Sequence, residues 1–206
     1  MTPYYQHDGI TIYHGDCADV LPTLARFDLL LTDPPYGIGK KWTGGSGHGW
    51  GKADKQKATR NDWDSDTPSR ALIDSVVALC RRSIIWGGNY FELPPSRCWL
   101  VWNKPERNFT LAEAELAWTN ADNVARVFDC KRSDRDRTHP TQKPLALMRW
   151  CLTLAASEGA TIFDPFMGSA TTLMAAKLAG MTATGIEINE AYCEIAANRL
   201  SQGVLF

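Results

Sequence analysis

Four consecutive residues, Asp33-Pro34-Pro35-Tyr36, carry groups that could act together on an amine. They directly follow an apolar run over residues 27–32 that predicts a buried strand. Two prolines stop a strand, which places Asp33 and Tyr36 at its carboxyl end, where open α/β sheets bind ligands. The alternative is a simple turn, in which Asp33 bonds its own backbone and Tyr36 is buried beside it.

The chemistry that suits these residues is attack by an exocyclic amine of a nucleobase on an electrophile. The lone pair of such a nitrogen is delocalised into the ring, so the nitrogen is a poor nucleophile. Asp33 and the Pro34 carbonyl can accept the two amine hydrogens and draw the lone pair back onto nitrogen. Tyr36 offers a ring face on which the base can stack.

A second candidate site lies in residues 160–188. Residues 160–163 predict a strand, 164–169 a tight turn and 170–179 a helix, an order that lets the backbone approach a nucleotide-like ligand. A further strand over 182–188 carries Glu187, 19 positions after Gly168 (187 − 168). A dinucleotide-binding unit places its acid on the ribose hydroxyls at a spacing of about 20.

The turn lacks two patterns that bind phosphate, Gly-x-Gly-x-x-Gly and Gly-Lys-Ser/Thr. A ligand with adenine and ribose but no phosphate fits better, and S-adenosylmethionine is the obvious one. The alternative is an ordinary tight turn and a strand-end glutamate in an α/β domain of another function.

Six motifs in a fixed order make the chain resemble the amino-methylating DNA methyltransferases, in the permuted (beta-type) group whose Asp-Pro-Pro-Tyr precedes the cofactor turn. The motifs span nearly the whole chain, and their order is far more specific than any one of them. They are His14-Gly15-Asp16-Cys17, Asp33-Pro34-Pro35-Tyr36-Gly37, Ile85-Trp86-Gly87-Gly88-Asn89-Tyr90-Phe91, His139-Pro140-Thr141-Gln142-Lys143-Pro144, Asp164-Pro165-Phe166-Met167-Gly168-Ser169 and Gly185-Ile186-Glu187.

The resemblance implies roles for individual residues. The catalytic site would consist of Asp33, Pro34, Pro35 and Tyr36. The cofactor would meet Asp16 at its adenine amine, Glu187 at its ribose, Asp164 and Gly168 at its methionine end, and Thr141 and Lys143 at its carboxylate, with Asp33, Phe163, Phe166 and Ser169 alongside. No metal site is implied. Family members often have Gly where this chain has Ala170, and the extra methyl group would tighten the turn.

The cysteines bear on the type of transfer. Methylation of cytosine at carbon 5 needs a thiolate nucleophile, which that enzyme family carries in a Pro-Cys pair, and none of the six cysteines here follows a proline. We therefore expect a direct in-line displacement without a covalent enzyme intermediate. The absence of Cys-x-x-Cys spacing is typical of reduced cysteines in a cytosolic protein.

A net charge of −1 does not by itself indicate nucleic-acid binding. However, residues 38–66, directly after the catalytic motif, are rich in glycine and tryptophan and carry six cations against Asp54 between positions 40 and 60: Lys40, Lys41, Lys52, Lys55, Lys57 and Arg60. We interpret this segment as a mobile basic loop that grips DNA phosphates around a flipped base. The alternative is a solvated insertion without a role.

The 206 residues, 44% of them apolar, predict one Rossmann-like α/β domain with helices on both faces of a mostly parallel sheet that includes an antiparallel hairpin. We expect that hairpin to pair residues 116–118 with 125–128. Other predicted elements are helices at 72–81, 144–156 and 189–200 and strands at 83–86 and 98–102. Since no large separate recognition domain fits between 37 and 138, target recognition falls to the loop and to a small segment at 104–138.

The sequence thus predicts a cytoplasmic enzyme that transfers a methyl group from S-adenosylmethionine to the N6 amine of adenine in double-stranded DNA. Asp33 favours adenine, since many cytosine-N4 enzymes of this kind have Ser there. The alternatives are cytosine-N4 methylation, methylation of an amine in RNA or in a protein glutamine, and a noncatalytic nucleic-acid-binding module of the same fold. A homodimer and a cognate restriction endonuclease are further candidate partners, and no membrane association is expected.

Overall fold

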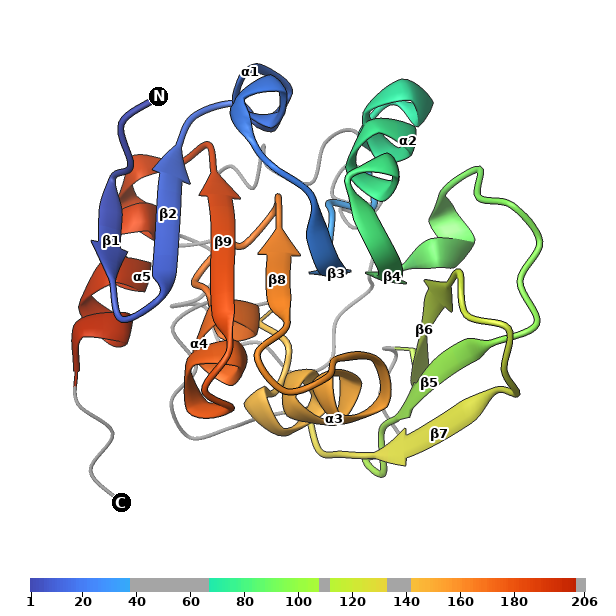
Figure 1. Cartoon of the computed structure of the whole chain (residues 1–206). Helices are drawn as coiled ribbons and strands as arrows, with labels where there is room; N and C mark the ends of the chain where they lie inside the picture. The colour runs from blue at the N-terminus through green and yellow to red at the C-terminus, as the bar shows by residue number, and fades with distance from the viewer. Residues whose placement is uncertain (38–66, 108–111, 133–141, 203–206) are drawn as a thin grey trace, which may run out of the picture.

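The computed structural model describes residues 1–37, 67–107, 112–132 and 142–202. These residues form one sheet of nine strands in the order β1-β2-β9-β8-β3-β4-β6-β5-β7 (Figure 1). The strands are β1 (Tyr5–His7), β2 (Ile10–His14), β3 (Phe27–Thr32), β4 (Cys80–Trp86), β5 (Trp99–Asn103), β6 (Ala114–Thr119), β7 (Arg126–Asp129), β8 (Thr161–Asp164) and β9 (Thr182–Glu187). The helices are α1 (Cys17–Val20), α2 (Arg70–Ala78), α3 (Leu145–Ala155), α4 (Thr171–Leu178) and α5 (Glu190–Ser201), with short 3-10 turns at Leu21–Thr23 and Gly88–Tyr90.

The middle of the sheet is parallel. Strands β2, β9, β8, β3 and β4 run in the same direction, while β1 pairs antiparallel with β2, and β6 pairs antiparallel with both β4 and β5. Consequently the carboxyl ends of five adjacent strands lie along one edge, where α/β sheets bind ligands. The predicted α/β class, with a mostly parallel sheet and an antiparallel part, is confirmed.

Helices cover both faces of the sheet because the side chains of its central strands alternate between two apolar clusters. Leu29 and Leu31 of β3 belong to the cluster that includes α3, α4 and α5, and Leu30 belongs to the cluster with α1 and α2. All three leucines are fully buried. Burial on both faces explains why β3 is a continuous apolar run in the sequence.

Strands β1 and β2 form a hairpin that the sequence prediction missed. They are joined by Asp8 and Gly9, whose φ angles of 48° and 74° are both left-handed. Two such residues form the tight turn that matches the twist of paired strands. The signal was present, because Asp-Gly is followed by the alternation of Ile10 and Ile12, both fully buried.

The predicted pairing of residues 116–118 with 125–128 is wrong. Strand β5 lies between β6 and β7, with Leu100 opposite Ala117 on one side and Arg126 on the other. Alternation correctly predicts a strand in both segments, but it does not specify the partner of a strand. Strands β6 and β7 are thus the parts of the segment at 104–138 that belong to the sheet, and the role of this segment in target recognition stays a prediction.

The observed boundaries of helix α2 and of the strand after it, β4, also differ from the predicted ones. Helix α2 ends at Ala78, not at 81, and β4 begins at Cys80, not at 83. The two arginines at the start of β4 are exposed, so the polar amino end of the strand looked like the last turn of a helix.

Ala170 precedes α4 with φ 64°, a left-handed conformation that an L-residue with a Cβ adopts at a cost of about 1–2 kcal/mol. We expect Ala170→Gly to raise the free energy of unfolding by about 0.5–1 kcal/mol, because the relieved strain exceeds the extra backbone entropy of glycine in the unfolded chain. Urea denaturation measures this. Ala160→Gly, at a buried position outside the left-handed region, should destabilise the protein.

No helix in the described ranges is both long enough and apolar enough to span a bilayer.

Candidate active site at the carboxyl edge of the sheet

The carboxylates that the sequence singled out lie at the ends of adjacent strands. Asp33 follows β3, Asp164 ends β8 and Glu187 ends β9, while Asp16 lies just after β2. The hydroxyl of Thr32 donates to Asp164 Oδ1 at 2.7 Å and so ties the ends of β3 and β8 together. These four carboxylates therefore share one edge of the sheet.

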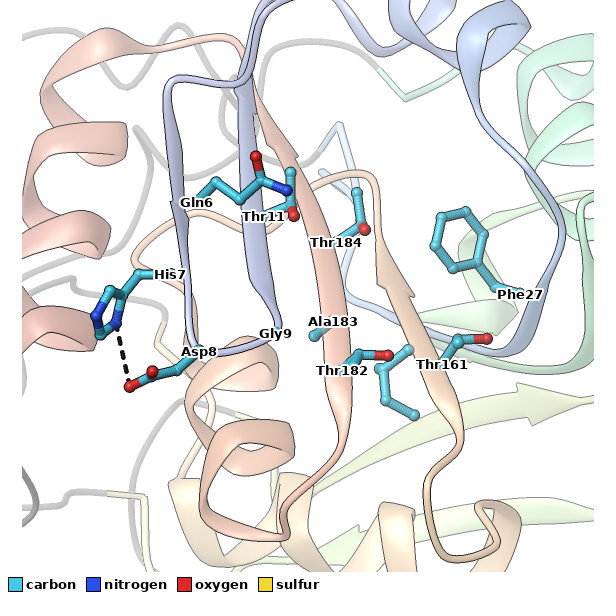
Figure 2. Close-up of a pocket in the computed structure, with 11 residues that line it drawn as sticks. Gln6, His7, Asp8, Gly9, Thr11, Phe27, Thr161, Thr182, Ala183 and Thr184 are labelled. Atoms are coloured by element: carbon cyan, nitrogen blue, oxygen red, sulfur yellow. Dashed lines mark ion pairs between the residues drawn. The ribbon is translucent and has the colours of Figure 1, made fainter.

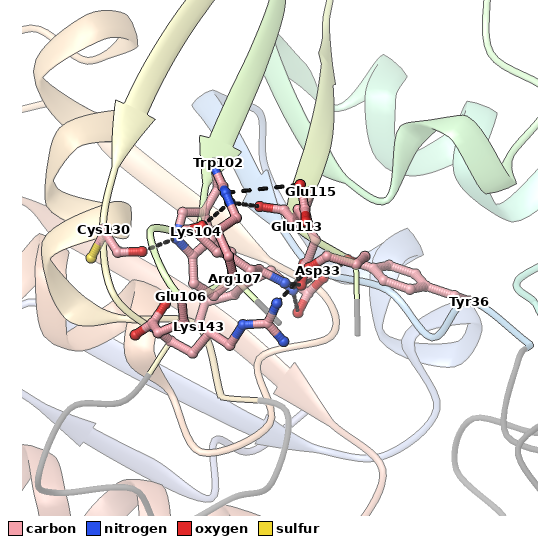
Figure 3. Close-up of polar contacts among 12 residues, drawn as sticks. Asp33, Tyr36, Trp102, Lys104, Glu106, Arg107, Glu113, Glu115, Cys130 and Lys143 are labelled. Atoms are coloured by element: carbon pink, nitrogen blue, oxygen red, sulfur yellow. Dashed lines mark hydrogen bonds and ion pairs between the residues drawn. The ribbon is translucent and has the colours of Figure 1, made fainter. Parts of the chain in front are cut away.

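Asp33 is held at both carboxylate oxygens. The Tyr36 hydroxyl donates to Oδ1 at 2.5 Å, and the Lys143 ammonium donates to Oδ2 at 2.5 Å (Figure 3). Each oxygen keeps a further lone pair, so the carboxylate can still accept hydrogens from a ligand. Pro34 is buried and Pro35 and Tyr36 are partly buried, which fixes the motif against the sheet.

The ring of Tyr36 packs against the 3-10 turn that follows β4 and the residue after it. It stacks on Tyr90, with 4.9 Å between centroids and 14° between planes, and meets Phe91 edge-on. Gly87, with φ 69°, allows this approach, because an added Cβ would lie 2.0 Å from Tyr36 Cε1. Tyr90 is 47% exposed, so the aromatic stack reaches the surface.

The turn after β8 is linked to the end of β9. The backbone N–H of Gly168 donates to Glu187 Oε2 at 3.0 Å, and that of Asn189 donates to Oε1 at 2.8 Å. Asp164 is only 3% exposed, and its carboxylate accepts the backbone N–H of Phe166. This hydrogen bond stabilises the turn from its buried side. Ser169 is buried and donates to Gln142 Oε1 at 3.3 Å, which joins the turn to the segment before α3.

These groups fit an adenosine-type ligand such as S-adenosylmethionine. Each oxygen of Glu187 has a lone pair left for a ribose hydroxyl. Gly168 has φ 50°, and an added Cβ there would meet nothing within 4 Å, so the space above the turn is open. Ile188, beside Glu187, is 67% exposed and offers an apolar surface for an adenine ring. The sequence reading missed Ile188, although an isoleucine directly after a strand-end acid was a visible signal.

Two cofactor candidates have other roles in the structure. The Phe163 side chain is fully buried and stacks on Phe27 at 4.6 Å between centroids, so it belongs to the core. Asp16 caps α1, since its Oδ1 accepts the N–H of Ala18 at 2.9 Å. Asp16 remains exposed, whereas Phe163 can contribute to the site only through its backbone.

The ammonium of Lys143 lies beside Asp33, and the preceding residue, Gln142, accepts a hydrogen bond from Ser169 of the turn after β8. The Nζ of Lys143 contacts Asp33 at 2.5 Å, Glu115 Oε2 at 3.1 Å and the Tyr36 hydroxyl at 3.2 Å. Asp33 and Tyr36 accept hydrogens of the ammonium, and Glu115 faces it at ion-pair distance. A role of Lys143 at the carboxylate of a cofactor stays a prediction. Glu115 was not predicted from the sequence, because nothing in the pattern of β6 distinguishes it from a surface glutamate.

Burial shifts the proton affinities of these groups. Desolvation raises the pKa of Asp33 despite the nearby Lys143, and it raises the pKa of Asp164 to about 6. Burial and the Asp33 carboxylate together raise the pKa of Tyr36 well above its ordinary value. An Asp33 with raised proton affinity is a strong hydrogen-bond acceptor, as the proposed role requires.

Burial keeps four of the cysteine thiols in the protonated form. Burial raises the pKa of Cys17 to about 11 and those of Cys80 and Cys193 to about 12, and it raises the pKa of Cys151 as well. A raised pKa removes the thiolate that nucleophilic catalysis needs. These shifts agree with a direct transfer.

A cavity of about 330 Å³ lies at the opposite edge of the sheet (Figure 2). Its lining includes Phe27, Thr161 and Thr182, which begin β3, β8 and β9. Because ligands of α/β sheets bind at the carboxyl ends of the strands, we do not assign the cofactor to this cavity.

Some predicted residues lie outside the described residues. These are Thr141 of the cofactor set and the whole proposed DNA-binding set, namely Lys40, Lys41, Lys52, Lys55, Lys57 and Arg60 in the loop at 38–66.

Solved structures share the fold. The complex of M1.HpyAVI with SAM aligns with a TM-score of 0.63 at 20% identity and covers 94% of this chain and 100% of that one. The PvuII DNA methyltransferase (cytosine-N4-specific) aligns with a TM-score of 0.65 at 14% identity and covers 99% and 90% of the two chains. The chain therefore has the fold of these two proteins.

Sequence comparison identifies the family. The family model described as DNA methylase matches residues 96–198. The type II methyltransferase M.ScaI of Streptomyces caespitosus is 24% identical over 96% of this chain and 83% of that protein. The DNA adenine methyltransferase YhdJ of Escherichia coli is 24% identical over 95% and 84%. The chain belongs to the DNA methylase family, the N6 and N4 amino-methyltransferases that take their methyl group from S-adenosylmethionine.

Proposed function

We propose that the chain methylates the N6 amine of adenine in double-stranded DNA, with Asp33 and Tyr36 as its catalytic residues. The observation that carries the proposal is the Asp33 carboxylate, fixed between Tyr36 and Lys143 at the end of β3, one strand away from the turn after β8. S-adenosylmethionine supplies a methyl group on a sulfonium sulfur.

Asp33 and the Pro34 carbonyl accept the two hydrogens of the amine, and Tyr36 supports the ring of the flipped base. In the transfer, a bond forms between nitrogen and the methyl carbon, the carbon–sulfur bond breaks, and the nitrogen loses one proton. Asp33 can take that proton, since burial raises its pKa. Much of the rate acceleration would come from holding amine and methyl donor in line, which is worth about 7–11 kcal/mol in favourable cases.

Adenine is favoured over cytosine by the type of residue 33. A carboxylate occupies this position, where many cytosine-N4 enzymes of this kind have serine, and E. coli YhdJ is named as a DNA adenine methyltransferase. The likeness to the cytosine-N4-specific PvuII enzyme keeps cytosine as the competing substrate. A noncatalytic module is disfavoured, because the contacts around Asp33 and Glu187 are intact.

To identify the methylated base, the chain is expressed in a bacterial host that lacks its own adenine-N6 and cytosine-N4 methylation. Mass spectrometry of the digested host DNA should detect N6-methyldeoxyadenosine, and base-modification sequencing should place it in one short site. N4-methyldeoxycytidine in its place would reject adenine as the substrate. The same chain carrying Asp33→Ala is the control for background methylation.

DNA would be held by the basic loop at 38–66, whose six cations would bind phosphates. The net charge of −1 for the whole chain hides this local positive charge. We further propose that the enzyme acts in the cytoplasm, where its substrate DNA is found, that it can form a homodimer, and that a cognate restriction endonuclease accompanies it.

Glu187→Gln should weaken the binding of S-adenosylmethionine by about 1.5–3 kcal/mol, the usual contribution of a hydrogen bond to a charged group. The neutral amide keeps the size of the side chain but loses the charge that the ribose hydroxyls would meet. Isothermal titration calorimetry measures the dissociation constant. Glu190→Gln, in the exposed first turn of α5, is the control and should bind normally. An unchanged dissociation constant in Glu187→Gln would show that this residue does not hold the ribose.

A further inference from the structure

Two buried lysines and two partly buried carboxylates form a row of charges of alternating sign that ends at Asp33. Lys104, just after β5, forms an ion pair with Glu115 Oε1 on β6. Glu115 Oε2 lies 3.1 Å from Lys143 Nζ, which in turn lies 2.5 Å from Asp33 Oδ2 (Figure 3). The side chains of Lys104 and Lys143 are only 6% and 7% exposed.

Two lysines and two carboxylates make this row neutral, which is the condition for keeping charges out of water. Glu115 is the member that both lysines share. Its carboxylate gives Lys143 a second acidic partner, so the Lys143 ammonium is divided between Glu115 and Asp33. Without Glu115, Lys143 would form its ion pair with Asp33 alone.

We propose that Glu115 is a positioning residue for methyl transfer, which sets the place of Lys143 and thereby the strength of Asp33 as an acceptor for the substrate amine. The inference rests on the proposed function of Asp33. It assigns to the scaffold strand β6 a role in the chemistry of the site.

The charged and titratable groups around Asp33 support this role. They are Tyr36 on its own turn, Lys143 before α3, Glu115 on β6 and Asp164 at the end of β8, with Lys104 one step further away. Burial raises the pKa of Asp33, Lys143 lowers it and Glu115 raises it. For Glu115 itself, burial raises the pKa, but Lys143 and Lys104 bring it down to about 2, so it stays charged at any working pH.

Glu115→Gln removes a negative charge that favours the protonated form of Asp33 and frees Lys143 to bind Asp33 fully. Asp33 then holds its proton less tightly and is a weaker acceptor. The acid limb of the kcat profile, where Asp33 must lose a proton, moves to lower pH by about one unit. On the plateau, kcat falls about 10-fold, because a weaker base transfers protons less effectively.

Lys104→Gln should act in the opposite direction. Glu115 then loses its other cation and draws Lys143 more strongly away from Asp33. The acid limb moves to higher pH. Glu113→Gln is the matched control, since Glu113 is 66% exposed, lies 3.8 Å from Arg107, and should change neither kcat nor the pH profile.

The experiment measures transfer of radiolabelled methyl groups to unmethylated plasmid DNA between about pH 5 and 9 for the full-length chain, with circular dichroism as the check on folding. We expect the acid limb to shift in opposite directions in the Glu115 and Lys104 variants. The dissociation constant for S-adenosylmethionine should be unchanged in both. A purely structural Glu115 would lower kcat without moving the limb, and that outcome overturns the inference. If Glu115→Gln does not fold, the inference is tested by Lys104→Gln alone: a shift of its acid limb to higher pH supports the inference, and an unmoved limb overturns it. No transfer by the wild-type chain would reject the proposed function, a separate failure.

Discussion

Asp33→Ala should lower the rate of methyl transfer by about 10²–10⁴-fold, the range for loss of a positioned acid–base group, and leave the binding of S-adenosylmethionine nearly unchanged. The reason is the position of the carboxylate. It receives the Tyr36 hydroxyl and the Lys143 ammonium, whereas the backbone contacts of the cofactor turn go to Glu187. Lys143 keeps Glu115 at 3.1 Å, so the substitution does not leave a buried lysine without a carboxylate.

Single-turnover transfer to DNA and calorimetry with S-adenosylmethionine separate the two effects. Asp28→Ala is the control, because Asp28 lies at the exposed end of the same strand and its carboxylate accepts hydrogen bonds from Thr161, at the start of β8. It should lose some stability but little activity. Loss of cofactor binding in step with activity in Asp33→Ala would show that Asp33 serves the cofactor and not the amine.

The elements around the site were predictable where burial imposes a pattern on the sequence. Strand β3 matches its predicted range of 27–32, because both faces are buried and the prolines after it define its end. The turn before α4 and the strand that ends at Glu187 were also visible, since tight turns need particular residues. Such local constraints determine the positions of Asp33, Asp164 and Glu187 along the chain.

The contacts between distant segments could not be predicted in the same way. Glu115 meets Lys143 across 28 positions (143 − 115), and the two come together only because β5 and β6 pair beside β4. The resemblance assigned Lys143 to a cofactor carboxylate, and it gave no indication of the contacts of Lys143 with Asp33, Glu115 and Tyr36. Strand pairing decides such contacts, and alternation alone carries no information about the partner.

Gly87→Ala should reduce kcat by about 10²-fold, although Gly87 offers no side chain to the reaction. A Cβ at this position would lie 2.0 Å from Cε1 of Tyr36 and 2.5 Å from its Cζ, so the ring has to move. The backbone cannot move in its place without strain, since the N–H of Gly87 donates to the Leu116 carbonyl at 2.8 Å. A displaced Tyr36 loses both its stack on Tyr90 and its hydrogen bond to Asp33.

The substitution also forces alanine into a left-handed conformation, which costs about 1–2 kcal/mol by itself. Gly159→Ala isolates that cost, because Gly159 has φ 71° against 69° for Gly87 and an added Cβ there would meet nothing within 4 Å. Both variants should lose similar stability from backbone strain in urea denaturation, with an additional loss in Gly87→Ala from the clash. Only Gly87→Ala should lose activity when kcat is measured at a temperature where both are folded. Equal kcat values in the two variants would mean that the position of the Tyr36 ring does not limit methyl transfer.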